Sequence, residues 1–219
     1  MFYGCTSLTQ APALPATTLN ERCYNGMFKG CTSLTQAPAL PALSIPDSSL
    51  SGTTVFGCYV SMFYGCTSLV QAPELPATTL PDVLNAGGTS VPAFGCYSDM
   101  FSGCTSLVQA PSLPATTLGG ACYGWMFYEC TSLVKAPALP ATTLAFYCYA
   151  GMFGRCTSLN EIRVSATDIS ADRCTESWTL NGSRKGDFWC DPNVTWATDS
   201  ISGIPRGWTR HDIADYPQT

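Results

Sequence analysis

Cysteine is the residue type in this chain with the widest chemistry, because thiols form disulfides, ligate metals and act as nucleophiles. The chain has 13 cysteines, and twelve of them recur at two places of a repeated motif while Cys190 stands apart. One series is Cys5, Cys31, Cys66, Cys104, Cys130 and Cys156, and the other is Cys23, Cys58, Cys96, Cys122, Cys148 and Cys174. This regular spacing predicts two columns of thiols along a stack of similar units.

Stacked columns favour buried free thiols over disulfides or zinc. Neighbouring levels of a sheet lie about 4.8 Å apart, which by itself permits a bridge. Stacked side chains point the same way, however, so their Cβ atoms lie further apart than the roughly 3.8 Å that a bridge prefers. No Cys-x-x-Cys pair occurs, and His211 is the single histidine. We predict apolar core thiols and no metal, with Cys174 and Cys190 the pair least firmly excluded from bridging.

The remaining chemistry argues against an enzyme and against a nucleic-acid binder. We find no phosphate-binding glycine loop, nucleophile elbow or repeated carboxylate pair, and a single histidine gives little scope for acid–base catalysis. The sequence therefore predicts no enzyme activity and no cofactor. A net charge of −5 with only 10 Lys and Arg leaves no basic stripe for phosphates. No run of 18 apolar residues occurs, so we predict no membrane span.

The units that must position these residues carry the motif Met-Phe-x-x-Cys-Thr-Ser-Leu. It starts at Met1, Met27, Met62, Met100, Met126 and Met152. The spacings are 26, 35, 38, 26 and 26 residues, so the basic unit has 26 residues and two copies carry insertions, near 43–56 and 80–94. Residues 1–174 are predicted to form six repeats of a solenoid. Residues 175–219 contain four of the 5 tryptophans and are predicted to form a cap over the last repeat.

Within a unit, the stretch that includes Ser106–Ala110 is predicted to be a short parallel strand. A proline follows at the same place in five copies and removes one ladder hydrogen bond from each level. The segment Cys-Tyr-x-x-Met-Phe-x-x-Cys mixes glycines with aromatics, so we expect one tight helical or 3-10 turn there at most. Leu34, Leu69, Leu107 and Leu133 are expected to stack in one buried column.

The pattern Phe-x-x-Cys-x-x-Leu before a short strand and a proline resembles the BspA-type leucine-rich repeat of bacterial cell-surface proteins. The resemblance covers residues 1 to about 174. The unit is longer than the family's commoner form and has Ala-Pro-x-Leu-Pro where an Ile-x-Ile-Pro strand is usual; only 159–164 returns to that form. The resemblance implies a right-handed leucine-rich-repeat solenoid and adhesion to host proteins, cells or glycans. It also implies a cell-surface or secreted location. Met1 already occupies a repeat place, so we expect upstream repeats and an export signal to be missing here.

Two surfaces are candidates for recognition. The strand face offers a column of exposed polar residues flanked by Val70, Val108 and Val134; its members are Gln10, Gln36, Gln71, Gln109 and Lys135, followed by Glu161. The two insertions, Leu43–Phe56 and Leu80–Phe94, follow the same Leu-Pro-Ala sequence, so they should emerge side by side. Their candidate contact residues are Asp47, Asp82 and Asn85.

Each candidate has an alternative interpretation. The glutamines could form a self-satisfying amide ladder, and the loops could be neutral insertions. A column of tyrosines at Tyr24, Tyr59, Tyr97, Tyr123 and Tyr149 is expected to pack more often than to recognise a ligand. The late tryptophans could stack on sugars instead of forming cap core. For the whole protein, the alternatives to an adhesive binding module are a structural spacer and a phage-borne repeat protein that contacts a host surface. The ligand and the oligomeric state are left open.

Overall fold

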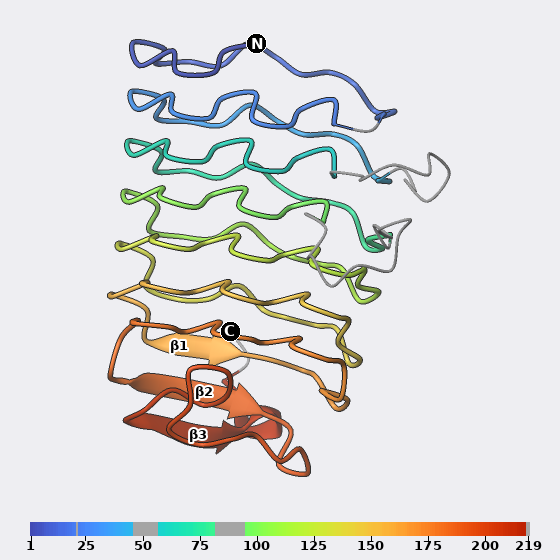
Figure 1. The fold of residues 1–219 in the computed structure, drawn as a ribbon, viewed down its shortest axis with the longest axis vertical. Helices are drawn as coiled ribbons and strands as arrows, with labels where there is room; N and C mark the ends of the chain where they lie inside the picture. The colour runs from blue at the N-terminus through green and yellow to red at the C-terminus, as the bar shows by residue number, and fades with distance from the viewer. Residues whose placement is uncertain (21, 46–56, 82–94, 218–219) are drawn as a thin grey trace.

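The computed structural model describes residues 1–20, 22–45, 57–81 and 95–217. The chain winds through successive coils that lie one above another, with the N-terminus at one end of the stack (Figure 1). Regular elements in this part of the chain are few: the strands β1 (Glu161–Arg163), β2 (Gly186–Cys190) and β3 (Trp208–Asp212), and the 3-10 helix η1 (Ile213–Asp215). Among these residues, no helix is long and apolar enough to cross a membrane.

Parallel pairing runs along one face of the whole stack. It passes through single bridges and then through β1, β2 and β3, in the order Gln10, Gln36, Gln71, Gln109, Lys135, Glu161, Asp187 and Thr209. The strand expected over Ser106–Ala110 is reduced to one bridge at Gln109. Proline accounts for this, because Pro111, two residues after Gln109, has no N–H to extend the ladder. The equivalent position two residues after Glu161 is Arg163, which has an N–H and lies in β1.

The opposite side of each coil is a run of tight turns. Backbone N–H groups alternate there between two kinds of acceptor: Met100 donates to the Tyr97 carbonyl in its own coil at 3.2 Å, and Phe101 donates to Met126 in the next coil at 2.9 Å. Left-handed residues recur in these turns, Asp99 with φ 56° among them. Because half of the donors point between coils, neither a helix nor a strand can propagate.

Between the two sides lies one continuous core built from columns of identical side chains. Leu34, Leu69, Leu107 and Leu133 are fully buried in it, as the sequence predicts. Phenylalanine rings stack from coil to coil with centroids 5.5 to 5.9 Å apart, at Phe2, Phe28, Phe63, Phe101, Phe127 and Phe153. A second ring column follows the tyrosines from Tyr24 to Tyr149, with centroids 5.5 to 6.0 Å apart.

All 13 cysteines are thiols in the structure, and eleven of them are buried; Cys5 and Cys23 are exposed. In the first column each buried thiol donates to a phenylalanine carbonyl of the preceding coil. The Sγ–O distances are 3.0 to 3.2 Å for Cys31, Cys66, Cys104, Cys130 and Cys156. These thiols therefore act both as apolar filling and as weak donors that link neighbouring coils.

The pairing register continues beyond Cys174, where the sequence motif stops. Glu161 pairs with Asp187, which keeps the 26-residue spacing. Trp178 stands where the repeats have methionine, is fully buried, and stacks on Trp196 at 5.6 Å. Its Nε1 donates to the Gly203 carbonyl at 2.9 Å. Trp178 and Trp196 are thus core residues, and burial removes both from the sugar-stacking alternative.

Candidate functional site

The candidate site lies on the paired face, along the four residues that we call the glutamine ladder: Gln10, Gln36, Gln71 and Gln109. Parallel bridges hold their backbones in register, and all four side chains are exposed, as is that of Lys135 at the next level. Within the part of the chain that the structure describes, none of the four amides takes part in a side-chain hydrogen bond. Amide-to-amide bonding, the alternative interpretation of this column, is not observed, so these donors and acceptors face solvent.

Two adjoining open depressions lie along this face. One has a volume of about 530 Å³ and includes Val70 and Gln71. The other has a volume of about 610 Å³ and includes Val134, Lys135 and Glu161. They share Gln109, Ala110, Pro111 and Ser112, so together they form one continuous depression, which we call the strand-face groove.

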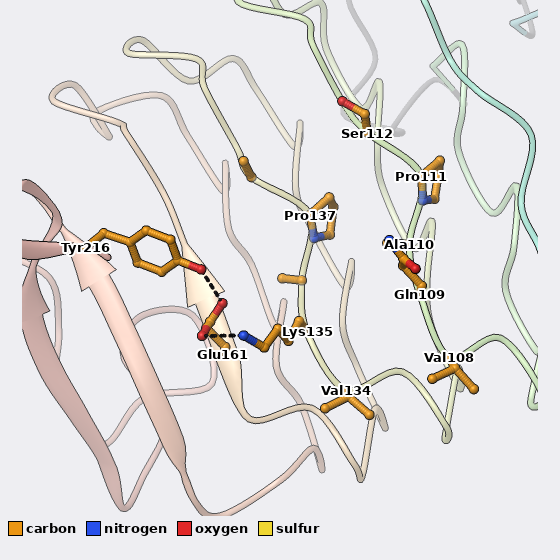
Figure 2. Close-up of a pocket in the computed structure, with 12 residues that line it drawn as sticks. Val108, Gln109, Ala110, Pro111, Ser112, Val134, Lys135, Pro137, Glu161 and Tyr216 are labelled. Atoms are coloured by element: carbon orange, nitrogen blue, oxygen red, sulfur yellow. Dashed lines mark hydrogen bonds and ion pairs between the residues drawn. The ribbon is translucent and has the colours of Figure 1, made fainter. Parts of the chain in front are cut away.

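Apolar side chains flank the polar centre of the strand-face groove. Figure 2 shows Val108 and Val134 on one side of the polar column and Pro111 and Pro137 on the other. The valines are the more accessible wall, because Val70 and Val108 each keep 54% of their surface exposed and Val134 keeps 36%. The groove thus combines uncharged hydrogen-bonding groups with aliphatic surface.

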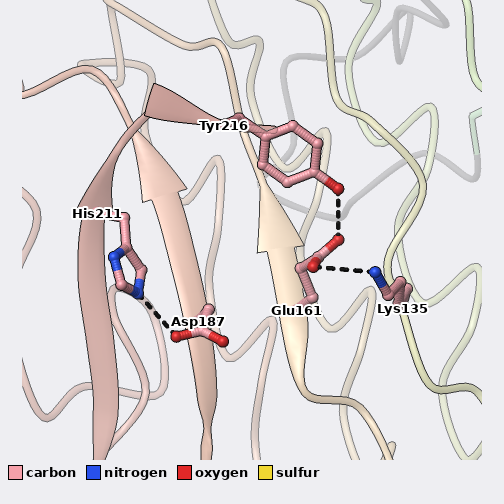
Figure 3. Close-up of polar contacts among 5 residues, drawn as sticks. All are labelled: Lys135, Glu161, Asp187, His211 and Tyr216. Carbon is pink, nitrogen blue, oxygen red and sulfur yellow. Dashed lines mark hydrogen bonds and ion pairs between the residues drawn. The ribbon is translucent and has the colours of Figure 1, made fainter. Parts of the chain in front are cut away.

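The groove ends in a polar cluster around Glu161, the first residue of β1 (Figure 3). Lys135 Nζ lies 3.2 Å from Glu161 Oε2, and the Tyr216 hydroxyl donates to Glu161 Oε1 at 2.8 Å. Hydrogen bonding to Glu161 raises the pKa of Lys135 and that of Tyr216. Arg163 lies over the Tyr216 ring at 4.4 Å from its centroid. Both carboxylate oxygens of Glu161 are therefore occupied by groups of the protein itself.

A second polar pair lies beyond this cluster. His211 Nε2 is 2.7 Å from Asp187 Oδ1, and the His211 ring stacks on Trp189 at 4.3 Å. Trp189 also meets the Tyr216 ring edge-on at 5.1 Å. Sequence reasoning did not find these contacts, because Tyr216 and His211 lie outside the repeats and no periodic spacing relates them to Glu161 or Asp187.

The other candidates from the sequence have different outcomes. Asp47, Asp82 and Asn85 lie outside the described residues. Tyr59, Tyr97, Tyr123 and Tyr149 are at most 2% exposed, so this column is packing and not a recognition surface. Burial raises the pKa of each of these four hydroxyls.

A further open depression of about 400 Å³ is lined by the threonines that follow the motif cysteine in three successive coils, and it contains the Arg155–Glu129 ion pair at 2.9 Å. Its lining residues are Thr105, Glu129, Thr131, Arg155, Thr157 and Asn181. These side chains offer hydroxyls and an already paired charge. Among the described residues, no group of three His, Cys, Asp or Glu side chains could hold a metal ion.

Comparisons with known proteins add no family. No protein-family model, no curated protein and no solved structure matches this chain.

Proposed function

We propose that this chain is a binding module of the leucine-rich-repeat solenoid class, related to the BspA-type repeats that its motif resembles. It acts at a cell surface or as a secreted protein and adheres to a protein, a cell or a glycan. The observation that carries the proposal is the glutamine ladder, whose exposed amides have no partner in the described part of the chain. Two of them, Gln71 and Gln109, line the strand-face groove. Solvated groups of this kind can exchange water for a ligand at small desolvation cost.

Binding is a better match to this groove than catalysis. The charged residues that line its two parts are Glu74, Lys135 and Glu161, and the last two are paired with each other. Among the described residues, the lining contains no cysteine or histidine, and its one serine, Ser112, has no imidazole beside it to act as a base. The module therefore recognises its ligand without a chemical step.

A structural spacer is the second candidate function. It is favoured by the uninterrupted phenylalanine column, whose rings stack at nearly constant separation through six coils. Such a stack suits a stiff rod. A phage-borne setting shares the binding surface and differs only in where the module is displayed.

The test is a binding survey of the intact chain against a glycan array and a panel of extracellular-matrix proteins. A variant with Gln71→Ala and Gln109→Ala should lose most of the binding. A matched control with Thr131→Ala and Thr157→Ala changes two threonines that do not line the groove and should bind normally. A third variant trims both insertions to the 26-residue pattern and measures the part played by the loops. Absence of any ligand for the intact chain would overturn the binding function and favour the spacer.

A further inference from the structure

We infer that the strand-face groove takes a linear, uncharged polysaccharide of extended pyranose rings, lying along the axis of the stack with one ring at each coil. This inference rests on the proposed binding function and deepens it by naming the ligand class. Three features carry it: the period of the glutamine ladder, the charge of the groove and the chemistry of its walls.

The period of the ladder selects a repeating ligand. Parallel bridges place Gln36, Gln71 and Gln109 at consecutive levels, which lie about 4.8 Å apart. An extended chain of equatorially linked pyranoses advances by a similar distance per ring. One ring can therefore face each amide. Adjacent rings are turned by about half a turn, so one edge of the chain presents the C2 and C3 hydroxyls and the C6 hydroxyl alternately, and an amide, which has both donors and an acceptor, can bond to either.

Extended peptides match this period less well. Side chains on one face of a β-strand recur about every 6.7 Å, so they lose register with the amides after two levels. A polyproline II helix repeats about every 9.3 Å and could meet every second level. Grooves for such helices are lined by aromatic rings, whereas Tyr216 is the one aromatic residue that lines the described groove.

Charge selects an uncharged polymer. Lys135, the single cation among the described residues of the lining, is paired with Glu161, and Glu74 adds a negative charge. The whole chain has a net charge of −5. Polyanionic glycans therefore meet no free cation in the described groove and are repelled by the protein as a whole.

The walls suit sugar rings. Each amide offers one acceptor and two donor hydrogens, which can bond to neighbouring ring hydroxyls. The exposed valines Val70, Val108 and Val134 provide aliphatic surface for the C–H faces of the rings. At Lys135 and Glu161 the amides give way to an ion pair, so the run of equivalent subsites ends there.

The experiment measures affinity against ligand length by calorimetry. Cello- and manno-oligosaccharides, from disaccharide to octasaccharide, are titrated into the intact chain. Affinity should rise by about threefold to tenfold per added ring while free amides remain, and then level off. Affinity should change by less than twofold between about 0.05 and 0.5 M salt, because no charges are screened. Gln71→Ala with Gln109→Ala should lower the affinity for the longest oligosaccharide by about tenfold to hundredfold. The control with Thr131→Ala and Thr157→Ala should leave it unchanged.

Several results would overturn the inference. Affinity independent of chain length, tighter binding of sulfated or uronic-acid polymers, or equal binding of amylose-type chains, whose axial linkage makes them coil, would each exclude it. Binding of a matrix protein or a proline-rich peptide at the glutamine ladder, with no oligosaccharide binding, would exclude this ligand class and keep the proposed function. Absence of every ligand would remove both.

Discussion

At the scale of single residues, the surroundings of the cysteines explain why a chain with 13 thiols forms no disulfide bonds in this structure. The thiol of Cys104 donates to the Phe63 carbonyl at 3.2 Å, and each of the other buried thiols of the first column likewise has an acceptor in the previous coil. Burial raises the pKa of the Cys66, Cys148 and Cys156 thiols to about 12. These three buried thiols are therefore uncharged at neutral pH, and the thiolate needed for exchange is scarce among them.

Alkylation should separate the exposed thiols from the buried ones. In the native protein at pH 7, iodoacetamide should label Cys5 and Cys23 and leave the eleven buried thiols unmodified. Raising the pH to 9 should not release Cys66 or Cys156, because their pKa of about 12 keeps them protonated. Peptide mass spectrometry after labelling in denaturant, without reductant, should find nearly all 13. Recovery of a single free thiol would instead indicate six disulfides.

Asp99 should make stability depend on pH. Burial raises the pKa of this carboxyl to about 6 from 3.8, and the positive charge of Lys29 opposes the rise. The folded state thus holds the proton more tightly than the unfolded state, so stability falls as the pH rises from about 4 through 6 and is then constant. Asp99→Asn should raise the free energy of unfolding by about 1 to 3 kcal/mol at pH 7 and by little at pH 4.

Urea unfolding of both proteins at the two pH values checks this prediction. Asparagine accepts a left-handed backbone about as readily as aspartate, so the φ of 56° at this position adds no new strain. Glu74→Gln, at an exposed position, is the control and should change stability by under about 0.5 kcal/mol at either pH. An equal gain at pH 4 and pH 7 from Asp99→Asn would contradict the assignment.

At the scale of elements, the turn segment takes the place that a helix occupies in many repeat units. Its backbone returns to the left-handed region at Gly4, Gly30, Gly65 and Gly103, and in later coils at Glu129 and Arg155. Side chains at the last two positions are tolerated because each reaches solvent, where they form an ion pair with each other at 2.9 Å. Gly95 has a different role, because its backbone lies directly against the backbone of the next coil.

Two glycine substitutions should therefore differ in cost. A Cβ on Gly95 would overlap the backbone of Cys122. Gly95→Ala should lower the free energy of unfolding by about 3 kcal/mol or more. A Cβ on Gly103 would lie 3.5 Å from the Gly65 Cα, an ordinary contact, so Gly103→Ala pays only for the left-handed φ of 75°, about 1 to 2 kcal/mol. Thermal and urea unfolding measure both; equal costs would show that the two coils separate easily at Gly95.

At the scale of the whole molecule, stability depends on contacts between neighbouring coils. Ring stacks, thiol donors and parallel bridges all join one coil to the next, and the described part has no helix pair or sheet packing that bypasses this order. Such a protein is expected to open from its weaker end and to transmit a local defect to adjacent coils.

Loss of Trp178 should show this transmission. Its ring contacts Trp196 and Phe188 later in the chain and Tyr149 in the preceding coil. Trp178→Ala should cost about 3 to 5 kcal/mol. Hydrogen exchange should rise most over β1 to β3, less over 126–156 and least over 100–125. Ile201→Ala, at a position 47% exposed, is the control and should leave hydrogen exchange unchanged in all three segments. Uniform loss of protection along the chain would mean that the whole stack unfolds as one unit.

The repeat motif by itself determined which residues share a level and a face. Equivalent positions of units that stack must align, so the pairing of Gln36 with Gln71 and the burial of Leu69 and Leu107 could be predicted from spacing alone. The sequence also predicts that the strands are short, because a proline follows the strand position in each of the first five units. Only the degree of shortening, to single bridges, came from the structure.

The tertiary structure decided the features that periodicity does not specify. Tyr216 reaches Glu161 across 55 residues, and the ladder continues through β2 and β3 although the motif stops at Cys174. These contacts depend on the path that the last part of the chain takes over the final coil. The shape of the strand-face groove is also a tertiary feature, because it depends on the positions of the valine side chains beside the amides. A periodic sequence specifies registry between units, while shape and the contacts at the end of the stack arise only when the chain is folded.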